Sequence, residues 1–224
     1  MRSRKLVLAS GSPRRAYLLR ACGLNFDTRP TDTPEDFSPD LPAYKVPSML
    51  SERKAQAARR SLLSNELVLT ADTIVILNGR ILNKPENEAE AKEMLSNLSG
   101  QTHQVVTAYC LADAENLEVR EEISQVTFNP LNERDILRYV ENFKPLDKAG
   151  AYGAQECLAD DYNPCSEEEN AFINALSLHD IIAESKPQNL PAEPLIAIQK
   201  ISGSYFNVMG LPIQKVYPWI MEKL

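Results

Sequence analysis

The segment KLVLASGSPRR, residues 5–15, constrains the fold of this chain most, because an apolar strand in it runs directly into a helix start. Lys5 to Ala9 is short and apolar, as expected of a strand. Ser12 suits the N-cap of a helix and Pro13 its first position, and Ala16 to Ala21 continues the helix. Strands that lead straight into helices are typical of α/β proteins, whose ligands bind at strand ends. We therefore expect an α/β fold with a ligand site at this junction.

Two arginines lie in the first turn of this expected helix, where the helix dipole is already positive. Arg14 and Arg15 are unfavourable there unless an anion lies among them. Together with the free N–H groups and the hydroxyls of Ser10 and Ser12, the two guanidiniums would suit a chain of phosphates. The alternative, an exposed helix start with incidental arginines, stays open at this point.

Length and composition limit the class of protein. A chain of 224 residues with 43% hydrophobic content can bury a substantial core, as one large domain or two closely joined lobes. It has no apolar run long enough to span a membrane and no signal peptide, so we expect a cytoplasmic protein without membrane contact. A zinc site or a disulfide framework is not expected, because the few cysteines and histidines are scattered: Cys22, Cys110, Cys157, Cys165, His103 and His179.

The net charge of −7 is concentrated in one segment. Residues 156–194 contain nine acidic residues and one basic residue, which leaves the rest of the chain at +1. A nearly neutral body with local basic clusters can bind a nucleotide. The lack of a broad basic face argues against a stable complex with DNA or RNA.

The remaining sequence alternates between strand and helix patterns. Residues 27–47 are rich in proline and are expected to form a loop. Asn78-Gly79 is typical of a type I′ hairpin between two strands. Helices are expected at 48–63, 86–98 and 132–142, with Asn87 or Glu88 near the start of the second and Asn132 at the start of the third, and strands at 67–77, 80–82, 103–112 and 117–128.

Asp72 lies in the middle of the apolar strand 67–77. A carboxylate in such a strand is costly to bury without a partner, so it is either hydrogen-bonded for structural reasons or used in chemistry. Lys84, just after the hairpin, could reach back to the same strand, although an exposed turn lysine is the simpler interpretation. Lys54 and Glu35 are uninformative when taken singly.

In combination these segments resemble the Maf family of nucleoside triphosphate pyrophosphatases. The resemblance covers nearly the whole chain except residues 156–194. It implies an α/β fold in which an extended mixed β-sheet with flanking helices forms two lobes around a central cleft. This fold is related to that of the inosine triphosphate pyrophosphatases. The matching motifs are LASGSPRR from Leu8, Glu35, the Lys54-Ala55 pair, ADTIVILNG from Ala71, NKP from Asn83, SGQTHQVVTA from Ser99, PLDKAGAYGAQ from Pro145 and SGSYFNVMGLP from Ser202.

The resemblance also implies a reaction, the hydrolysis of a nucleoside triphosphate to the monophosphate and pyrophosphate, aided by Mg²⁺ or Mn²⁺. By resemblance Asp72 is the proton acceptor, and Glu35 and Asp72 are candidate ligands of the divalent metal cation, for which carboxylate oxygens are suitable. The residues that would bind the substrate phosphates are Ser10, Ser12, Arg14, Arg15, Lys54 and Lys84.

Three positions bear on the choice of base. Members of the family that act on dTTP and UTP have arginine, threonine and glutamine there, which match Arg14, Thr73 and Gln155, whereas the subgroup that prefers 7-methyl-GTP has tryptophan, glutamine and glutamate. This sequence therefore resembles the dTTP/UTP pyrophosphatase subgroup. A glutamine amide offers both a donor and an acceptor, as a pyrimidine edge requires.

The sequence departs from the family directly after Gln155. We expect a single domain over 1–224 with an acidic insertion at about 156–194, in which a capping box at Ser166 and Glu169 is followed by a helix over 171–183. Pro187, Pro191 and Pro194 then favour an extended return. The insertion could be a surface excursion, which we favour, a lid over the cleft or a contact in a homodimer.

Two classes of function are therefore open. The first is an enzyme that removes dTTP, UTP or modified pyrimidine triphosphates. The alternative is a nucleotide-binding regulator of cell division or septum formation, with the acidic insertion as its partner surface and with weak or no hydrolysis.

Overall fold

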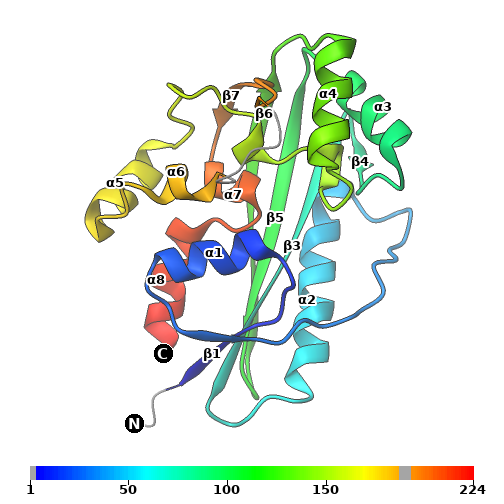
Figure 1. Ribbon diagram of the computed structural model, residues 1–224. Helices are drawn as coiled ribbons and strands as arrows, with labels where there is room; N and C mark the ends of the chain where they lie inside the picture. Colours follow the sequence, from blue (N-terminus) through cyan, green and yellow to red (C-terminus); the bar gives the residue numbers. More distant parts are fainter. Residues whose placement is uncertain (1–3, 187–192) are drawn as a thin grey trace.

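A computed structural model describes residues 4–186 and 193–224, and a seven-stranded mixed sheet forms its centre (Figure 1). The strand order is β2-β1-β3-β5-β6-β7, with β4 also paired to β3. β1 runs parallel to both of its neighbours and the other pairs are antiparallel, so the expected mixed sheet is confirmed. The strands are β1 (Lys5–Leu8), β2 (Phe26–Thr28), β3 (Glu66–Leu77), β4 (Arg80–Leu82), β5 (Thr102–Ala112), β6 (Leu117–Phe128) and β7 (Ile198–Ser202).

Helices cover both faces of the sheet, and Figure 1 shows α2 on one side of the long strands with α1 and α8 on the other. The helix α2 packs its Val46 and Leu50 against Ile74 and Ile76 of β3. The larger core on the opposite face includes the buried Trp219. The helices are α1 (Pro13–Ala21), α2 (Val46–Arg59), α3 (Glu88–Leu98), α4 (Glu133–Phe143), α5 (Glu167–Leu176), α6 (Ile181–Ser185), α7 (Tyr205–Met209) and α8 (Ile213–Lys223), with short 3₁₀ turns η1 (Ala43–Lys45), η2 (Ala149–Ala151) and η3 (Ala154–Glu156).

One edge of β3 is only partly covered. On that edge β1 pairs with residues 66–69 and β4 with residues 75–77, while β5 pairs along the opposite edge. Among the described residues no strand pairs with 70–74 on this side, so backbone groups there are available to side chains and ligands. Asp72 and Thr73 lie in this stretch, which we call the open edge of β3.

The local signals in the sequence give the correct elements, with several shifted boundaries. Ser12, Asn87, Asn132 and Ser166 cap their helices through their side chains, as expected. The hairpin turn has positive φ angles of 51° and 78° at its two central residues, as a type I′ turn requires. The first strand ends at Leu8. The helix α2 begins at Val46 instead of residue 48, because Pro47 is accepted in the first turn of a helix, and it ends at Arg59 instead of residue 63.

The described part of the acidic insertion packs into the core. Ile173 and Ile181 are buried there, and the Tyr17 hydroxyl of α1 donates to the Ile181 carbonyl at 2.8 Å. The insertion is therefore anchored to the core by one face, while many of its side chains are exposed, and its role stays a prediction. The single expected helix over 171–183 is wrong: α5 ends at Leu176, where Ser177 adopts a left-handed conformation, and α6 follows. Pro187 and Pro191 lie outside the described residues, and Pro194 lies in an irregular segment before β7.

Glu169 of α5 is completely buried and joins the insertion to α7. Its carboxylate accepts hydrogen bonds from the Ser204 hydroxyl at 2.6 Å and from the Phe206 and Tyr205 backbone at 2.8 and 3.1 Å. It also completes the capping box with Ser166. The acidic insertion therefore fixes the start of the helix whose far end reaches the open edge of β3.

No helix within 4–186 or 193–224 is long and apolar enough to cross a membrane. The four cysteines named above are free thiols in the structure. Burial raises the pKa of Cys22 and Cys110 to about 12, so neither is poised as a nucleophile.

Candidate active site

A cleft of about 730 Å³ opens at the open edge of β3, so the expected central cleft is confirmed. Its walls come from the β1–α1 junction, α2, the segment from Asp147 to Gln155 and the end of α7. Every residue that the sequence assigns to the site lines this cleft: Ser10, Ser12, Arg14, Arg15, Glu35, Lys54, Asp72, Thr73, Lys84 and Gln155. The structure thus brings the predicted residues together, while their roles stay predictions.

The β1–α1 junction presents hydroxyls and helix N–H groups to the cleft. The Ser12 hydroxyl accepts from the Arg15 backbone N–H at 3.4 Å, and the Ser10 hydroxyl accepts from the Ser12 N–H at 3.2 Å. These bonds form because Pro13 begins the helix and leaves its first N–H groups without intrahelical partners. The start of α1 is therefore suited to an anionic ligand.

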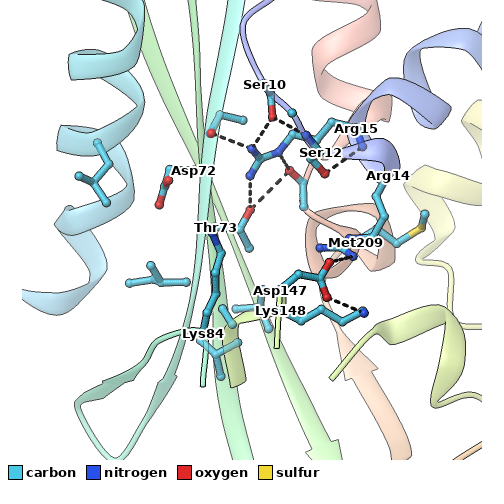
Figure 2. A pocket seen from close by; sticks show the side chains of 18 of the residues that line it. Ser10, Ser12, Arg14, Arg15, Asp72, Thr73, Lys84, Asp147, Lys148 and Met209 are labelled. Atoms are coloured by element: carbon cyan, nitrogen blue, oxygen red, sulfur yellow. Dashed lines mark hydrogen bonds and ion pairs between the residues drawn. The ribbon is translucent and has the colours of Figure 1, made fainter. Parts of the chain in front are cut away.

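Arg15 is held mainly by the protein (Figure 2). Its guanidinium donates to the Ser10 hydroxyl at 3.1 Å, the Ala71 carbonyl at 2.9 Å, the Thr73 hydroxyl at 3.0 Å and the Gly210 carbonyl at 2.8 Å. An arginine has five N–H donors, so at most one is left for a phosphate. Burial lowers the pKa of Arg15 to about 10, and it remains a cation at neutral pH. Its main work in the structure is to join α1, the open edge of β3 and the end of α7.

Arg14 lies against an acidic residue that the roles predicted from the sequence do not include. Its Nη1 lies 3.6 Å from Oδ2 of Asp147, and Asp147 also accepts from Lys148 Nζ at 2.8 Å. Burial of Asp147 opposes its ionisation, but Lys148 and Arg14 outweigh that effect and its pKa lies below the ordinary value. No role was predicted for Asp147 or Lys148 from the sequence, although both belong to the motif PLDKAGAYGAQ. Two adjacent charged residues before a stretch rich in glycine and alanine could have marked them as candidate site residues.

Asp72 lies on the face of β3 that packs against α2, and its neighbour Thr73 faces Arg15 (Figure 2). Asp72 is only 8% exposed, and Lys54 Nζ of α2 donates to its Oδ1 at 2.6 Å. The same Nζ donates to Glu35 Oε1 at 3.1 Å. Burial opposes the ionisation of Glu35, but the nearby cations, Lys54 above all and then Lys84 and Arg15, together lower its pKa. One lysine therefore orients both carboxylates.

The two carboxylates fit a divalent cation by their chemistry. Asp72 Oδ2 and Glu35 Oε2 take no hydrogen bond from the residues that the structure describes. Hard oxygen atoms of this kind are the preferred ligands of Mg²⁺ and Mn²⁺. The described residues contain no group of three or more acidic, histidine or cysteine side chains arranged as metal ligands. The pair therefore fits a cation that is shared with substrate phosphates better than one enclosed by protein alone.

Lys84 and Gln155 line the cleft from two further elements. Lys84 follows β4, and Figure 2 shows its chain extending alongside β3 toward Thr73. Gln155 lies in η3 and is only 8% exposed. Within the described part of the chain, no hydrogen bond engages its side-chain amide, which faces the cleft unpaired.

Tyr152, another residue of the cleft wall, contacts a buried histidine. Its hydroxyl lies 2.8 Å from Nε2 of His103, and burial lowers the pKa of His103 to about 4. The unfolded chain takes up a proton at this histidine below about pH 6.5, whereas the folded protein keeps it neutral down to about pH 4. The unfolded state therefore binds more protons in this window, and folding stability falls as the pH decreases through it.

We expect the free energy of unfolding to decrease between about pH 7 and about pH 5, with a shallower slope in His103→Gln. Urea unfolding at several pH values measures the slope. The exposed His179 supplies the control, because His179→Gln should keep the slope of the unaltered protein. Equal slopes in His103→Gln and the unaltered protein would contradict the assignment.

Comparison with known proteins gives the family. A family model described as Maf-like protein matches residues 5–162. The dTTP/UTP pyrophosphatase of Flavobacterium johnsoniae is 35% identical over 216 residues, which span 96% of this chain and 93% of the relative. That of Phocaeicola vulgatus is 37% identical over 214 residues, 95% of this chain and 93% of the relative. Among solved structures, the Staphylococcus aureus Ham1 protein aligns with 56% of this chain and 72% of its own, at 16% identity and a TM-score of 0.41. By the family model and these relatives, the chain belongs to the Maf family.

Proposed function

We propose that this protein hydrolyses dTTP and UTP, and modified pyrimidine triphosphates of the same shape, to the nucleoside monophosphate and pyrophosphate. One observation carries the proposal: in a single cleft, the nearly buried carboxylate of Asp72 lies beside Lys54, close to a helix start that offers phosphate-binding donors. The relatives named dTTP/UTP pyrophosphatase support the same substrate class.

The triphosphate is bound by donors from two parts of the chain, the start of α1 and the residues just after β4. The N–H groups and serine hydroxyls at the start of α1 donate hydrogen bonds to one part of the phosphate chain, and Arg14 and Lys84 supply positive charge from either side. Among the described residues, only one nitrogen atom of the Arg14 guanidinium contacts Asp147, so Arg14 has further donors for the ligand. Arg15 contributes chiefly by holding Ser10 and Thr73 in place.

Asp72 then acts as the general base. Its carboxylate accepts a proton from water as the water oxygen forms a bond to the α-phosphorus, and the bond from that phosphorus to the bridging oxygen breaks to release pyrophosphate. Lys54 orients the carboxylate through its 2.6 Å hydrogen bond. A divalent cation held by Glu35 and Asp72 would neutralise charge on the substrate phosphates.

Gln155, Thr73 and Arg14 are proposed to select the base. The Gln155 amide is unpaired in the cleft and can meet the adjacent donor and acceptor of a thymine or uracil edge. Thr73 is fixed by Arg15 at 3.0 Å and by the Thr107 hydroxyl at 2.9 Å, so it forms a rigid part of the wall. A rigid wall discriminates between bases of different size.

The partners follow from the charge of the chain. A body of nearly neutral charge, with several basic side chains in the cleft, suits a free nucleotide in the cytoplasm and no stable nucleic acid complex. A homodimer stays a proposal, which sedimentation of the purified protein would test.

A panel of nucleoside triphosphates with Mg²⁺ or Mn²⁺ tests the proposed activity. We expect kcat/KM for dTTP and UTP to exceed that for dGTP and 7-methyl-GTP by about tenfold or more. A base that does not match the site leaves polar groups of the protein without hydrogen bonds, and this cost is large enough for such a ratio. Chromatography should show the monophosphate and pyrophosphate as products. Release of orthophosphate would contradict the reaction, and binding without turnover would favour the nucleotide-binding regulator instead.

A further inference from the structure

The residue directly after Gln155 holds the loop that carries it. Glu156 is nearly buried, with 12% of its side chain exposed, although it is the first of the nine acidic residues in the insertion. Because the Gln155 amide has no bond of its own among the described residues, its position depends on the backbone around it. That backbone is set by what holds Glu156.

The Glu156 carboxylate is bound to α4 by a hydrogen bond and to the cleft wall by an ion pair. Its Oε2 accepts from the Tyr139 hydroxyl at 2.6 Å, and its Oε1 lies 3.6 Å from Lys148 Nζ. The same Tyr139 hydroxyl accepts from the Gly153 N–H at 3.0 Å. One phenol of α4 thus joins both ends of the short loop from Gly153 to Glu156.

Gly153 shows how closely the carboxylate fits this loop. A Cβ atom at Gly153 would lie 2.8 Å from the Glu156 carboxylate, a distance that real Cβ atoms do not tolerate. The carboxylate therefore occupies the space where a side chain would otherwise stand. A side chain at Gly153 would therefore require the Glu156 carboxylate to move away from its present place.

The return of the acidic insertion is attached at the same place. The Leu195 N–H donates to the Glu156 carbonyl at 3.1 Å, and the Ile198 N–H donates to the Cys157 carbonyl at 3.0 Å. Glu156 is thus the residue at which the cleft wall, α4 and both ends of the insertion meet.

We propose that Glu156 is a positioning residue for base selectivity, and that its carboxylate, held by Tyr139 and Lys148, fixes the loop that presents Gln155 to the nucleobase. This inference rests on the proposed function and extends it to a residue that does not touch the substrate. It predicts an effect on the choice between bases and on KM, with little effect on the chemical step at Asp72.

The test is Glu156→Gln, which keeps the size of the side chain and removes its charge. We expect the ratio of kcat/KM for dTTP over dGTP to fall about five- to tenfold, mainly through a higher KM for dTTP, while kcat changes less than about twofold. Tyr139→Phe, which removes only the hydroxyl, should shift the ratio in the same direction. Glu141→Gln, the same charge change at an exposed position of α4, is the matched control and should leave the ratio unchanged.

An unchanged ratio in Glu156→Gln would overturn the inference, as would an equal loss of kcat for both nucleotides, which indicates a general structural effect. Equilibrium binding of dTTP and dGTP in an Asp72→Asn background measures the same selectivity without turnover. If the unaltered protein binds both nucleotides but hydrolyses neither, the proposed reaction fails, whereas the binding ratio still decides the role of Glu156.

Discussion

Replacing Asp72 with asparagine should lower kcat for dTTP hydrolysis by about 10²- to 10⁴-fold, the range expected for the loss of a general base. Asparagine keeps the shape of the side chain and can still accept from Lys54, but it cannot take a proton from water. KM should change much less than kcat, because Asp72 acts mainly after the substrate is bound.

Initial rates of pyrophosphate release over a range of dTTP concentrations provide both constants. Asp40→Asn is the matched control, since it makes the same change at an exposed position of the proline-rich loop and should keep the original rate. Turnover in Asp72→Asn close to that of the unaltered protein would rule out Asp72 as the general base. Glu35 would then be the next candidate for this role.

Replacing Glu169 with glutamine should lower the free energy of unfolding by about 3 kcal/mol, because buried donors then lose a charged acceptor. The donors in the interior are the Ser204 hydroxyl and two backbone N–H groups at the start of α7, and Ser166 donates in addition through its N–H and hydroxyl. A glutamine amide can accept with only one oxygen, and its NH₂ group would face donors. For a domain of this size the expected fall in Tm is roughly 6–12 °C.

Thermal unfolding followed by circular dichroism measures this effect. Glu168 stands beside Glu169 in the first turn of α5 but is exposed, so Glu168→Gln is a close control and should shift Tm by less than about 2 °C. Equal Tm values in the two variants would contradict the structural role of Glu169. A higher KM for dTTP in Glu169→Gln would show that α7 transmits the change to Gly210 and Arg15.

The local parts of the fold were predictable from the sequence because their causes are local. A capping residue such as Ser12 or Asn132 acts within one turn of helix, and a hairpin such as that at Asn78 depends on two adjacent residues. The division of residues 171–183 into two helices was missed, since the left-handed residue at the break is Ser177 and not a glycine.

The residues of the site were predictable from the sequence, but the hydrogen bonds between them were not. A carboxylate in an apolar strand marks Asp72, and motifs of the family mark the other residues, but no pattern in the sequence shows that Lys54 bonds to Asp72 and Glu35 together. The role of Glu169 was hidden for the same reason. Its partners lie 35 to 37 residues further along the chain, and only the packing of the insertion brings them together.

The alternation of side chains along the open edge of β3 has a consequence for the evolution of new specificities. Thr73 and its neighbour Asp72 are consecutive, yet one faces Arg15 and the other faces Lys54. A library of variants confined to the Thr73 and Gln155 side could therefore explore other bases while the proton acceptor stays untouched. Substitutions on one side of this strand can therefore change the preferred base while the residue that takes part in hydrolysis stays the same.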